Sequence, residues 1–193
     1  MNNISADNIP LKALFIKYKS VIKFMLTFLG VYVALSVIYS FYLEFSDGSI
    51  YYPDYFTNLV GLQTSELLEF FGYQSEVLKH PNEPSLKLLL NGEYLARIVE
   101  GCNALSVIIL FISFIIAFSG TFKITTIYIL SGSVLIYIVN LLRIAVLAIG
   151  LYLFPEYEEV LHNVVFPGII YGMVFLLWVI WVNRFSKLKK KHV

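Results

Sequence analysis

The chain has 193 residues, of which 59% are hydrophobic and 14% charged, with a formal net charge of +1. The mean hydropathy is +0.77. This apolar content exceeds that of a usual soluble domain and indicates an integral membrane protein. The nearly neutral charge gives no support for nucleic acid as a partner.

Four apolar stretches are each long enough to cross a bilayer, which takes about 20 mostly apolar residues in a helix. They cover about 21–43, 98–118, 124–154 and 164–182. We therefore predict an all-α integral membrane protein with about four transmembrane helices, forming a single membrane domain over 1–193. The first stretch is too long for a signal peptide, and no small-residue cleavage site follows it, so we interpret it as an uncleaved anchor.

The basic residues predict the orientation, because lysine and arginine favour the cytoplasmic side of a membrane. Ten of them flank the cytoplasmic ends of the predicted spans: Lys12, Lys17, Lys19, Lys23, Lys123, Arg184, Lys187, Lys189, Lys190 and Lys191. Both termini are then cytoplasmic, and segment 44–97 lies outside. The basic tail 184–193 is expected to contact the lipids of the cytoplasmic leaflet.

The outer segment contains two predicted elements. Residues 59–71 mix apolar and polar side chains as an interfacial helix does. Residues 86–90 and 93–99 flank Asn91-Gly92, which predicts a β-hairpin with a two-residue turn. The hairpin leads into the second span, where it serves either as an edge for an extended substrate or as a simple lid.

Three chemically capable side chains converge at one depth. Cys102 lies at the outer end of the second span, and His162 precedes the fourth span on the same side. Arg143 lies about 19 residues beyond Ile124, which is roughly 28 Å along a helix and near the outer boundary. A guanidinium inside an apolar run costs roughly 2.5–3.5 kcal/mol on insertion scales, so it is expected to have a function.

This set of residues supports acyl transfer through a thioester. Only a small fraction of a free thiol is ionised at neutral pH, and a neighbouring cation or imidazole raises that fraction. His162 can accept the thiol proton and return it to a leaving amine, while Arg143 can stabilise an oxyanion. Asn140 is three residues before Arg143 on the same helical face and is expected to orient it or hold substrate.

Each of these residues also has an ordinary structural interpretation. A lone cysteine is often only packed, a histidine at a helix start is often a cap, and Arg143 can pair with Glu100 or a helix carbonyl. The chain has one cysteine and three scattered histidines, which excludes an internal disulfide and gives no metal-ligand spacing. We therefore expect no metal ion and no cofactor.

The run Glu-Gly-Cys-Asn-Ala at 100–104, Asn140-Leu141-Leu142-Arg143 and His162-Asn163 resemble the three signatures of the exosortase/archaeosortase family. The order of Cys, Arg and His and their helix positions also match. The resemblance covers about 98–182, and the short chain is similar to the compact flavobacterial type called exosortase F. The chain departs from many members at Ala104, where they have glycine.

This resemblance implies a cysteine protease-transpeptidase of the bacterial inner membrane, with its site facing the periplasm. Its partners would be exported proteins with a carboxy-terminal motif, one transmembrane helix and a basic cluster, together with an acyl acceptor of unknown identity. Cys102 would be the nucleophile, His162 the acid and base, and Arg143 the residue that positions substrate or stabilises the oxyanion. Glu100, Asn140 and Asn163 would support them.

A second interpretation needs no catalysis. The chain would then be a helical membrane adaptor or a subunit of an export assembly, with Arg143 paired structurally and Cys102 only packed. The two interpretations differ in one property, because a catalytic thiolate reacts with external thiol reagents and a packed thiol does not.

Overall fold

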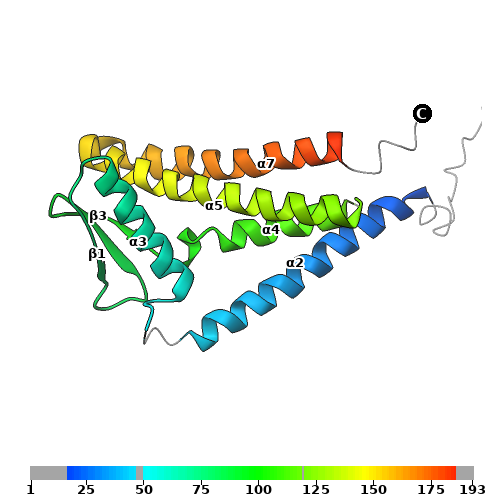
Figure 1. Ribbon diagram of the computed structural model, residues 1–193, viewed down its shortest axis with the longest axis horizontal. Helices are drawn as coiled ribbons and strands as arrows, with labels where there is room; N and C mark the ends of the chain where they lie inside the picture. Colours follow the sequence, from blue (N-terminus) through cyan, green and yellow to red (C-terminus); the bar gives the residue numbers. More distant parts are fainter. Residues whose placement is uncertain (1–16, 47–49, 119, 186–193) are drawn as a thin grey trace, which may run out of the picture.

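The computed structural model describes residues 17–46, 50–118 and 120–185 (Figure 1). It is mostly helical, and three of its helical segments are long and apolar enough to cross a membrane. These are α2 (Lys19–Phe45), α5 (Phe122–Leu153) and the segment Pro155–Arg184, which contains α7 (Phe166–Arg184). The bounds of α2, α5 and α7 agree with three of the predicted spans within two residues, whereas the segment that contains α7 begins nine residues earlier than predicted. Lys12 and tail residues 186–193, both part of the predicted topology, lie outside the described residues.

The predicted second span is a much shorter helix than expected. Helix α4 (Leu105–Ala117) has 13 residues, or about 20 Å, and begins seven residues later than predicted. Ile98 instead ends a strand, and the turn η1 (Glu100–Cys102) follows it. The apolar composition of this stretch misled the prediction, because composition does not reveal where backbone hydrogen bonds change from a sheet to a helix.

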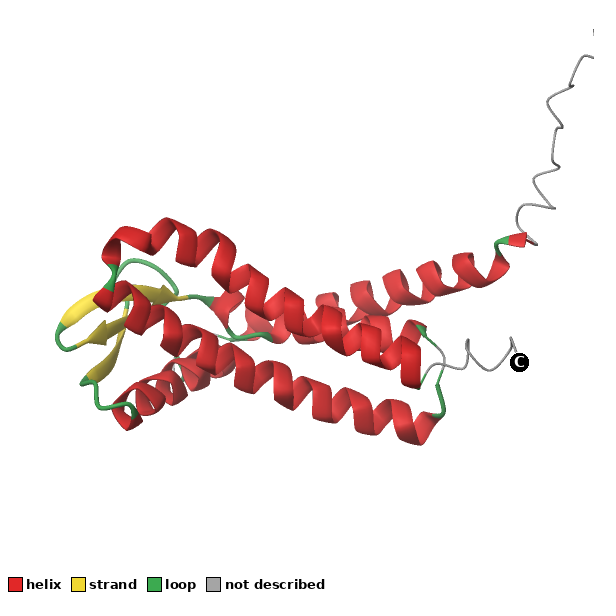
Figure 2. Ribbon diagram, turned by 90° about the horizontal axis from the view of Figure 1, so that it is seen from above, coloured by secondary structure: helices red, strands yellow, loops and turns green. Residues whose placement is uncertain are grey.

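A small helix-and-sheet unit, here called the outer module, covers one end of the helices. It consists of α3 (Tyr55–Phe70), β1 (Ser75–Lys79), β2 (Leu86–Leu90) and β3 (Glu93–Ile98). The antiparallel strands have the order β1-β2-β3, and the sheet lies at one end of the helices (Figures 1 and 2). Helix α3 packs against the sheet and against α5.

The predicted hairpin is confirmed, and its turn has the expected chemistry. Leu90 pairs with Glu93 across Asn91 and Gly92, whose φ angles of +51° and +84° suit a two-residue hairpin turn. Strand β1 was missed because its residues alternate only weakly between buried and exposed positions. Its presence makes β2 the central strand, so the free edges of the sheet belong to β1 and β3.

Two hydrophobic cores stack along α5. The membrane core joins α4, α5 and α7, and contains Phe111, Ile115, Ile136, Ile170, Val174, Leu177 and Trp181. The outer core joins α5 to the outer module, and contains Val60, Leu68, Leu86, Leu88, Leu90, Ile98, Ile144, Ala145 and Ala148. Asn140 lies between Ile136 and Ile144, four residues from each, and therefore marks the boundary between the two cores.

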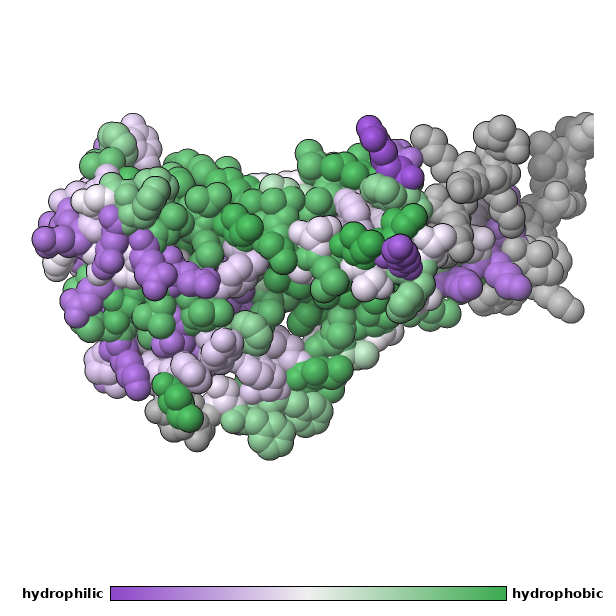
Figure 3. All heavy atoms as spheres, in the orientation of Figure 1, coloured by the Kyte–Doolittle hydropathy of each residue, from purple (hydrophilic) through white to green (hydrophobic). Residues whose placement is uncertain are grey.

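Helix α2 stands apart from the other helices. It has no buried residue, and its contacts are mainly with α4, where Phe24 packs against Phe114 and Phe118 at ring-centroid distances of 5.9 Å and 4.5 Å. Toward the outer module it diverges from the helices around α5 (Figure 1). The visible face of the molecule is largely apolar along the helices, and hydrophilic residues gather over the outer module (Figure 3), as expected for a bilayer around the helices.

Candidate functional site

Cys102, the only cysteine of the chain, lies where the outer module meets the helices. It closes the η1 turn, in which its backbone N–H donates to the Val99 carbonyl at 2.8 Å. The Asn140 side chain donates to the Cys102 carbonyl at 2.7 Å. These two bonds hold the backbone of Cys102 in place, and the residue as a whole is half-buried.

Arg143 lies on α5 one turn beyond Asn140 and is also half-buried. Asn140, three residues earlier on the same helix, bonds to the Cys102 carbonyl, so Arg143 lies about one helical turn from that contact. Within the described part of the chain, the recorded ion pair joins Arg97 and Glu83, so the expected alternative of an Arg143–Glu100 pair is not formed there. Arg143 therefore forms no ion pair with a described carboxylate.

Asn140 is buried and bonds to the Cys102 turn. Its side chain is 1% exposed and holds the turn that carries the nucleophile candidate. Because a buried amide without partners costs about 1–3 kcal/mol, the bond to Cys102 stabilises both residues. Asn140 therefore positions Cys102, whereas the sequence suggested that it positions Arg143 or substrate.

Asn103 is a site residue that sequence reasoning missed. It is 1% exposed, and its amide nitrogen donates to the Tyr39 hydroxyl at 2.9 Å and to the Thr57 hydroxyl at 3.3 Å. Its side-chain oxygen accepts the Leu105 N–H at 3.0 Å and so caps the start of α4. The sequence contained one signal of this role, an amide side chain directly before an apolar run. Asn103 ties α2, α3 and α4 together beside Cys102.

Ala104 has an unusual backbone for an alanine. Its φ of +65° lies in the left-handed region, which costs a residue with a Cβ about 1–2 kcal/mol and suits glycine. Residues 102–105 thus change direction sharply between η1 and α4. This geometry gives a physical reason for glycine at the corresponding position of the proteins that the sequence resembles.

His162 does not contact the other two predicted catalytic residues. It lies in η3 (Leu161–Val165), a π-helical turn closed by a bond from the Phe166 N–H to the Leu161 carbonyl. Leu161 packs over Gly150. Gly150 is seven residues beyond Arg143, which places this turn about 10 Å farther along the bundle axis.

The surroundings of His162 are open and acidic. The imidazole is exposed, its Nδ1 lies 3.4 Å from the side-chain oxygen of Asn163, and it borders a surface hollow of about 440 Å³ with Glu156, Glu158 and Glu159. Asn163, the predicted support, is exposed as well. In the described ranges, no group of three or more His, Cys, Asp or Glu side chains is arranged to hold a metal ion.

The structure therefore brings Cys102, Asn140 and Arg143 together at the boundary of the two cores. His162 lies about 10 Å farther along the bundle axis. Glu100 is exposed at the start of the Cys102 turn, where its carbonyl accepts the Asn103 N–H at 3.2 Å. No family model, curated protein or solved structure matches the chain. Its resemblance to the exosortase/archaeosortase family stays a prediction made from the sequence.

Proposed function

We propose that the chain is a multi-pass membrane cysteine peptidase and transpeptidase of the exosortase/archaeosortase type. It would cleave the carboxy-terminal sorting tail of exported proteins through a thioester and transfer them to a surface acceptor. One observation carries the proposal: the Asn140 side chain bonds to the Cys102 carbonyl, so the turn that bears the only cysteine of the chain lies about one helical turn from Arg143. A nearby cation that is not paired favours the thiolate, which is the reactive form of cysteine.

The proposed topology has four crossings with both termini in the cytoplasm of a bacterial cell and the site facing the periplasm. Helix α4 is short for a crossing, so residues 98–104 would complete it at the outer interface. Irregular backbone is tolerated at membrane depth where protein covers it. Ile98, Asn103 and Ala104 are all buried, which supports this arrangement.

The chemistry requires only the residues of this chain and its substrates. The Cys102 thiolate would attack the carbonyl carbon of the scissile peptide bond, and the resulting oxyanion would be stabilised by the Arg143 guanidinium. The carbon–nitrogen bond then breaks, the amine leaves with the proton that His162 has taken from the Cys102 thiol, and the acyl group remains on sulfur as a thioester. An acceptor nucleophile or water attacks the thioester and returns the thiol.

His162 has to approach Cys102 for this role. Catalytic hydrogen bonds are often long without substrate and tighten when it binds. The π-helical turn around His162 is a suitable place for such a rearrangement, since π-helical turns are rare and are often found at functional sites. Substrate binding would draw the imidazole toward the thiol.

Processing of a co-expressed membrane-anchored protein tests the proposal. The substrate candidate carries a carboxy-terminal motif, one transmembrane helix and a basic cluster, and it is compared in cells with the intact chain or with Cys102→Ala at equal membrane abundance. Processing that depends on Cys102 supports the peptidase. Equal processing in both cells removes Cys102 as the nucleophile.

The non-catalytic adaptor remains the second candidate because of one observation, the exposed position of His162 away from Cys102. In an adaptor, Asn140 and Arg143 would only stabilise the junction between the two cores. The His162→Ala variant separates these functions. It abolishes processing by a peptidase that uses the imidazole and leaves an adaptor's membrane assembly intact.

A further inference from the structure

A cleft of about 480 Å³ lies beside the Cys102 turn, where α2 meets the outer module. Its lining comes from four places: the end of α2, the start of α3, the loop between β1 and β2, and the end of β3. The lining residues are Leu43, Ser46, Pro53, Asp54, Glu83, Pro84, Ser85, Arg97, Val99 and Glu100. Clefts of this size hold small ligands or short peptide segments.

The cleft reaches to within one turn of Cys102. Val99 and Glu100 line it, and the Val99 carbonyl accepts the Cys102 N–H at 2.8 Å. Cys102 is three residues beyond Val99 and two beyond Glu100, both of which line the cleft. A polypeptide lying in the cleft would therefore present a neighbouring bond to Cys102.

Ser85 gives the cleft an unused hydrogen-bonding group. It is 1% exposed and lines the cleft, and its hydroxyl makes no hydrogen bond to the described residues. Buried hydroxyls are rarely left without a partner, because the cost is about 1–3 kcal/mol. Rotation of the Ser85 side chain toward the cleft on binding would let a backbone N–H or carbonyl of a peptide supply the missing partner.

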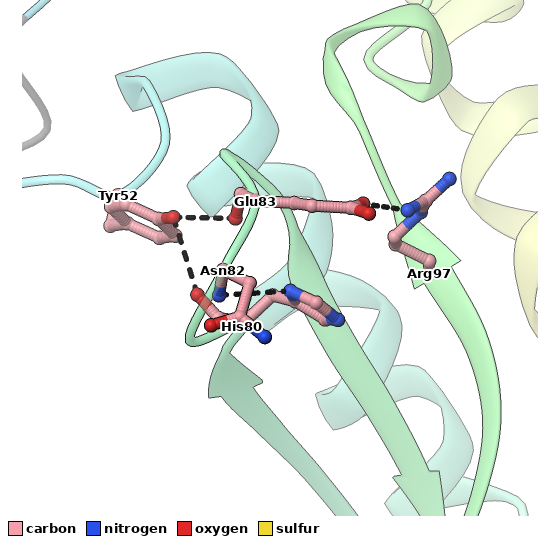
Figure 4. A network of polar contacts seen from close by, with 5 residues as sticks. All are labelled: Tyr52, His80, Asn82, Glu83 and Arg97. Atoms are coloured by element: carbon pink, nitrogen blue, oxygen red, sulfur yellow. Dashed lines mark hydrogen bonds and ion pairs between the residues drawn. The ribbon is translucent and has the colours of Figure 1, made fainter.

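The loop between β1 and β2, which carries Ser85, is held by contacts with Tyr52 and with β3 (Figure 4). The Tyr52 hydroxyl donates to the Glu83 carbonyl at 2.6 Å, and Arg97 on β3 forms an ion pair with the Glu83 side chain. The Asn82 N–H donates to His80 Nδ1 at 3.3 Å within the same loop. These contacts fix the loop before any ligand binds, which lowers the entropic cost of binding.

The charges of the cleft favour a cation. Three carboxylates, Asp54, Glu83 and Glu100, face one guanidinium, which leaves two negative charges. Asp54 already accepts bonds from Thr57 N–H and Tyr42, and Glu83 is paired with Arg97. Among the described residues, Glu100 has no ion pair, so it is the carboxylate available to a ligand.

We propose that this cleft binds an extended peptide segment that carries a lysine or arginine side chain, with Glu100 contacting the cation and Ser85 the peptide backbone. The proposal rests on the proposed function, because the segment would belong to the membrane-anchored substrate next to its scissile bond. The cleft would thus select substrates with a basic side chain near the scissile bond, a selection that neither the catalytic residues nor the membrane topology supplies. Strand β3 is an edge strand of the sheet and contributes Arg97 to the cleft, so it can pair with such a segment.

Binding of two blocked, fluorescein-labelled octapeptides tests the proposal. They alternate serine and valine and differ only at one central position, which is lysine in one and glutamate in the other. Fluorescence polarisation is measured with the full chain carrying Cys102→Ala in nanodiscs of neutral lipid, so no thioester chemistry contributes. The lysine peptide is expected to bind about tenfold more tightly than its glutamate twin, a difference of 1.4 kcal/mol.

Two variants test which residues of the cleft cause the preference for the lysine peptide. Glu100→Gln is expected to remove most of the preference for lysine, whereas Ser85→Ala weakens both peptides by a similar factor. Glu156→Gln removes an exposed carboxylate far from the cleft and serves as the matched control. A benzophenone residue placed beside the central lysine should cross-link to residues 83–85 or 97–100.

Equal binding of the two peptides, or an equal effect of Glu100→Gln and Glu156→Gln, would overturn the proposed specificity. Cross-linking confined to other segments would overturn the location. Because binding is measured without the thiol, these outcomes do not bear on catalysis. A chain that processes its substrate through Cys102 but shows no lysine preference would keep the proposed function and lose this inference.

Discussion

The Asn140 side chain donates a 2.7 Å hydrogen bond to the Cys102 carbonyl. This bond joins the longest helix of the chain to the turn that bears its only cysteine, at the boundary between the two hydrophobic cores. The position of the Cys102 turn relative to Arg143 therefore depends on a buried amide that takes no direct part in the proposed reaction.

Replacing Asn140 with alanine should both destabilise the protein and release the Cys102 turn. The carbonyl would lose its partner in a buried place, at a cost of about 1–3 kcal/mol. The expected result is a lower thermal unfolding midpoint and altered alkylation of Cys102. Gln74→Ala removes an exposed amide and should change stability by less than about 0.5 kcal/mol. Equal effects of the two variants would contradict the proposed linkage.

Replacing Arg143 with glutamine should slow the reaction of Cys102 with a membrane-impermeant maleimide added from the outer side. In the proposed mechanism the guanidinium would stabilise the thiolate, so its loss is expected to reduce the rate about tenfold, equivalent to roughly 1.4 kcal/mol. Because the chain has one cysteine, labelling reports this site alone. Arg184→Gln, at the opposite end of the helices, is the control. An unchanged rate in Arg143→Gln would exclude activation by Arg143.

Replacing Ala104 with glycine should cost much less stability than the same change at Ala148. Both residues are buried and lose a methyl group, but only Ala104 has a left-handed backbone. Relief of that conformation offsets about 1–2 kcal/mol at Ala104, whereas Ala148 lies inside a helix, where glycine is unfavourable. Thermal unfolding in the same detergent compares the two. Equal losses would show that Ala104 carries no such strain.

Replacing Gly132 with alanine should disturb the contact between α4 and α5. A Cβ at this position would clash with the Phe111 ring, and overpacking of this kind costs about 1–3 kcal/mol. A Cβ at Gly172 would have no neighbour within 4 Å, so Gly172→Ala is the matched control. Thermal unfolding midpoints should fall only for Gly132→Ala. A similar fall for both would contradict the described packing.

Composition and periodicity predicted the features that rest on long patterns. The apolar runs at 21–43, 124–154 and 164–182 correspond to long helices, and Asn91-Gly92 predicted the hairpin turn. These signals are strong because the bilayer dictates helix length and the turn needs positive φ angles. The outer module was only half predicted. Strand β1 depends on pairing with β2, which the local pattern of its own five residues does not encode.

The candidate site was predicted in part for a similar reason. Helix position predicted Cys102, Arg143 and His162 at one depth; in the structure Cys102 bonds to Asn140, one helical turn before Arg143, and His162 lies in a separate π-helical turn. The partner of Asn140 and the role of Asn103 depend on backbone atoms of a turn that sequence patterns did not predict. Depth along the bundle also did not determine which way His162 faces, since that depends on the π-helical turn before α7.

Detection of a covalent substrate adduct on Cys102 tests the central claim most directly. The intact chain and Cys102→Ala are each co-expressed with the candidate sorting-tail protein, denatured in acid and analysed by mass spectrometry with and without hydroxylamine. The account predicts an acyl adduct on the intact chain that hydroxylamine removes and that Cys102→Ala lacks. Processed substrate without any hydroxylamine-sensitive adduct, or the same adduct on Cys102→Ala, would contradict it.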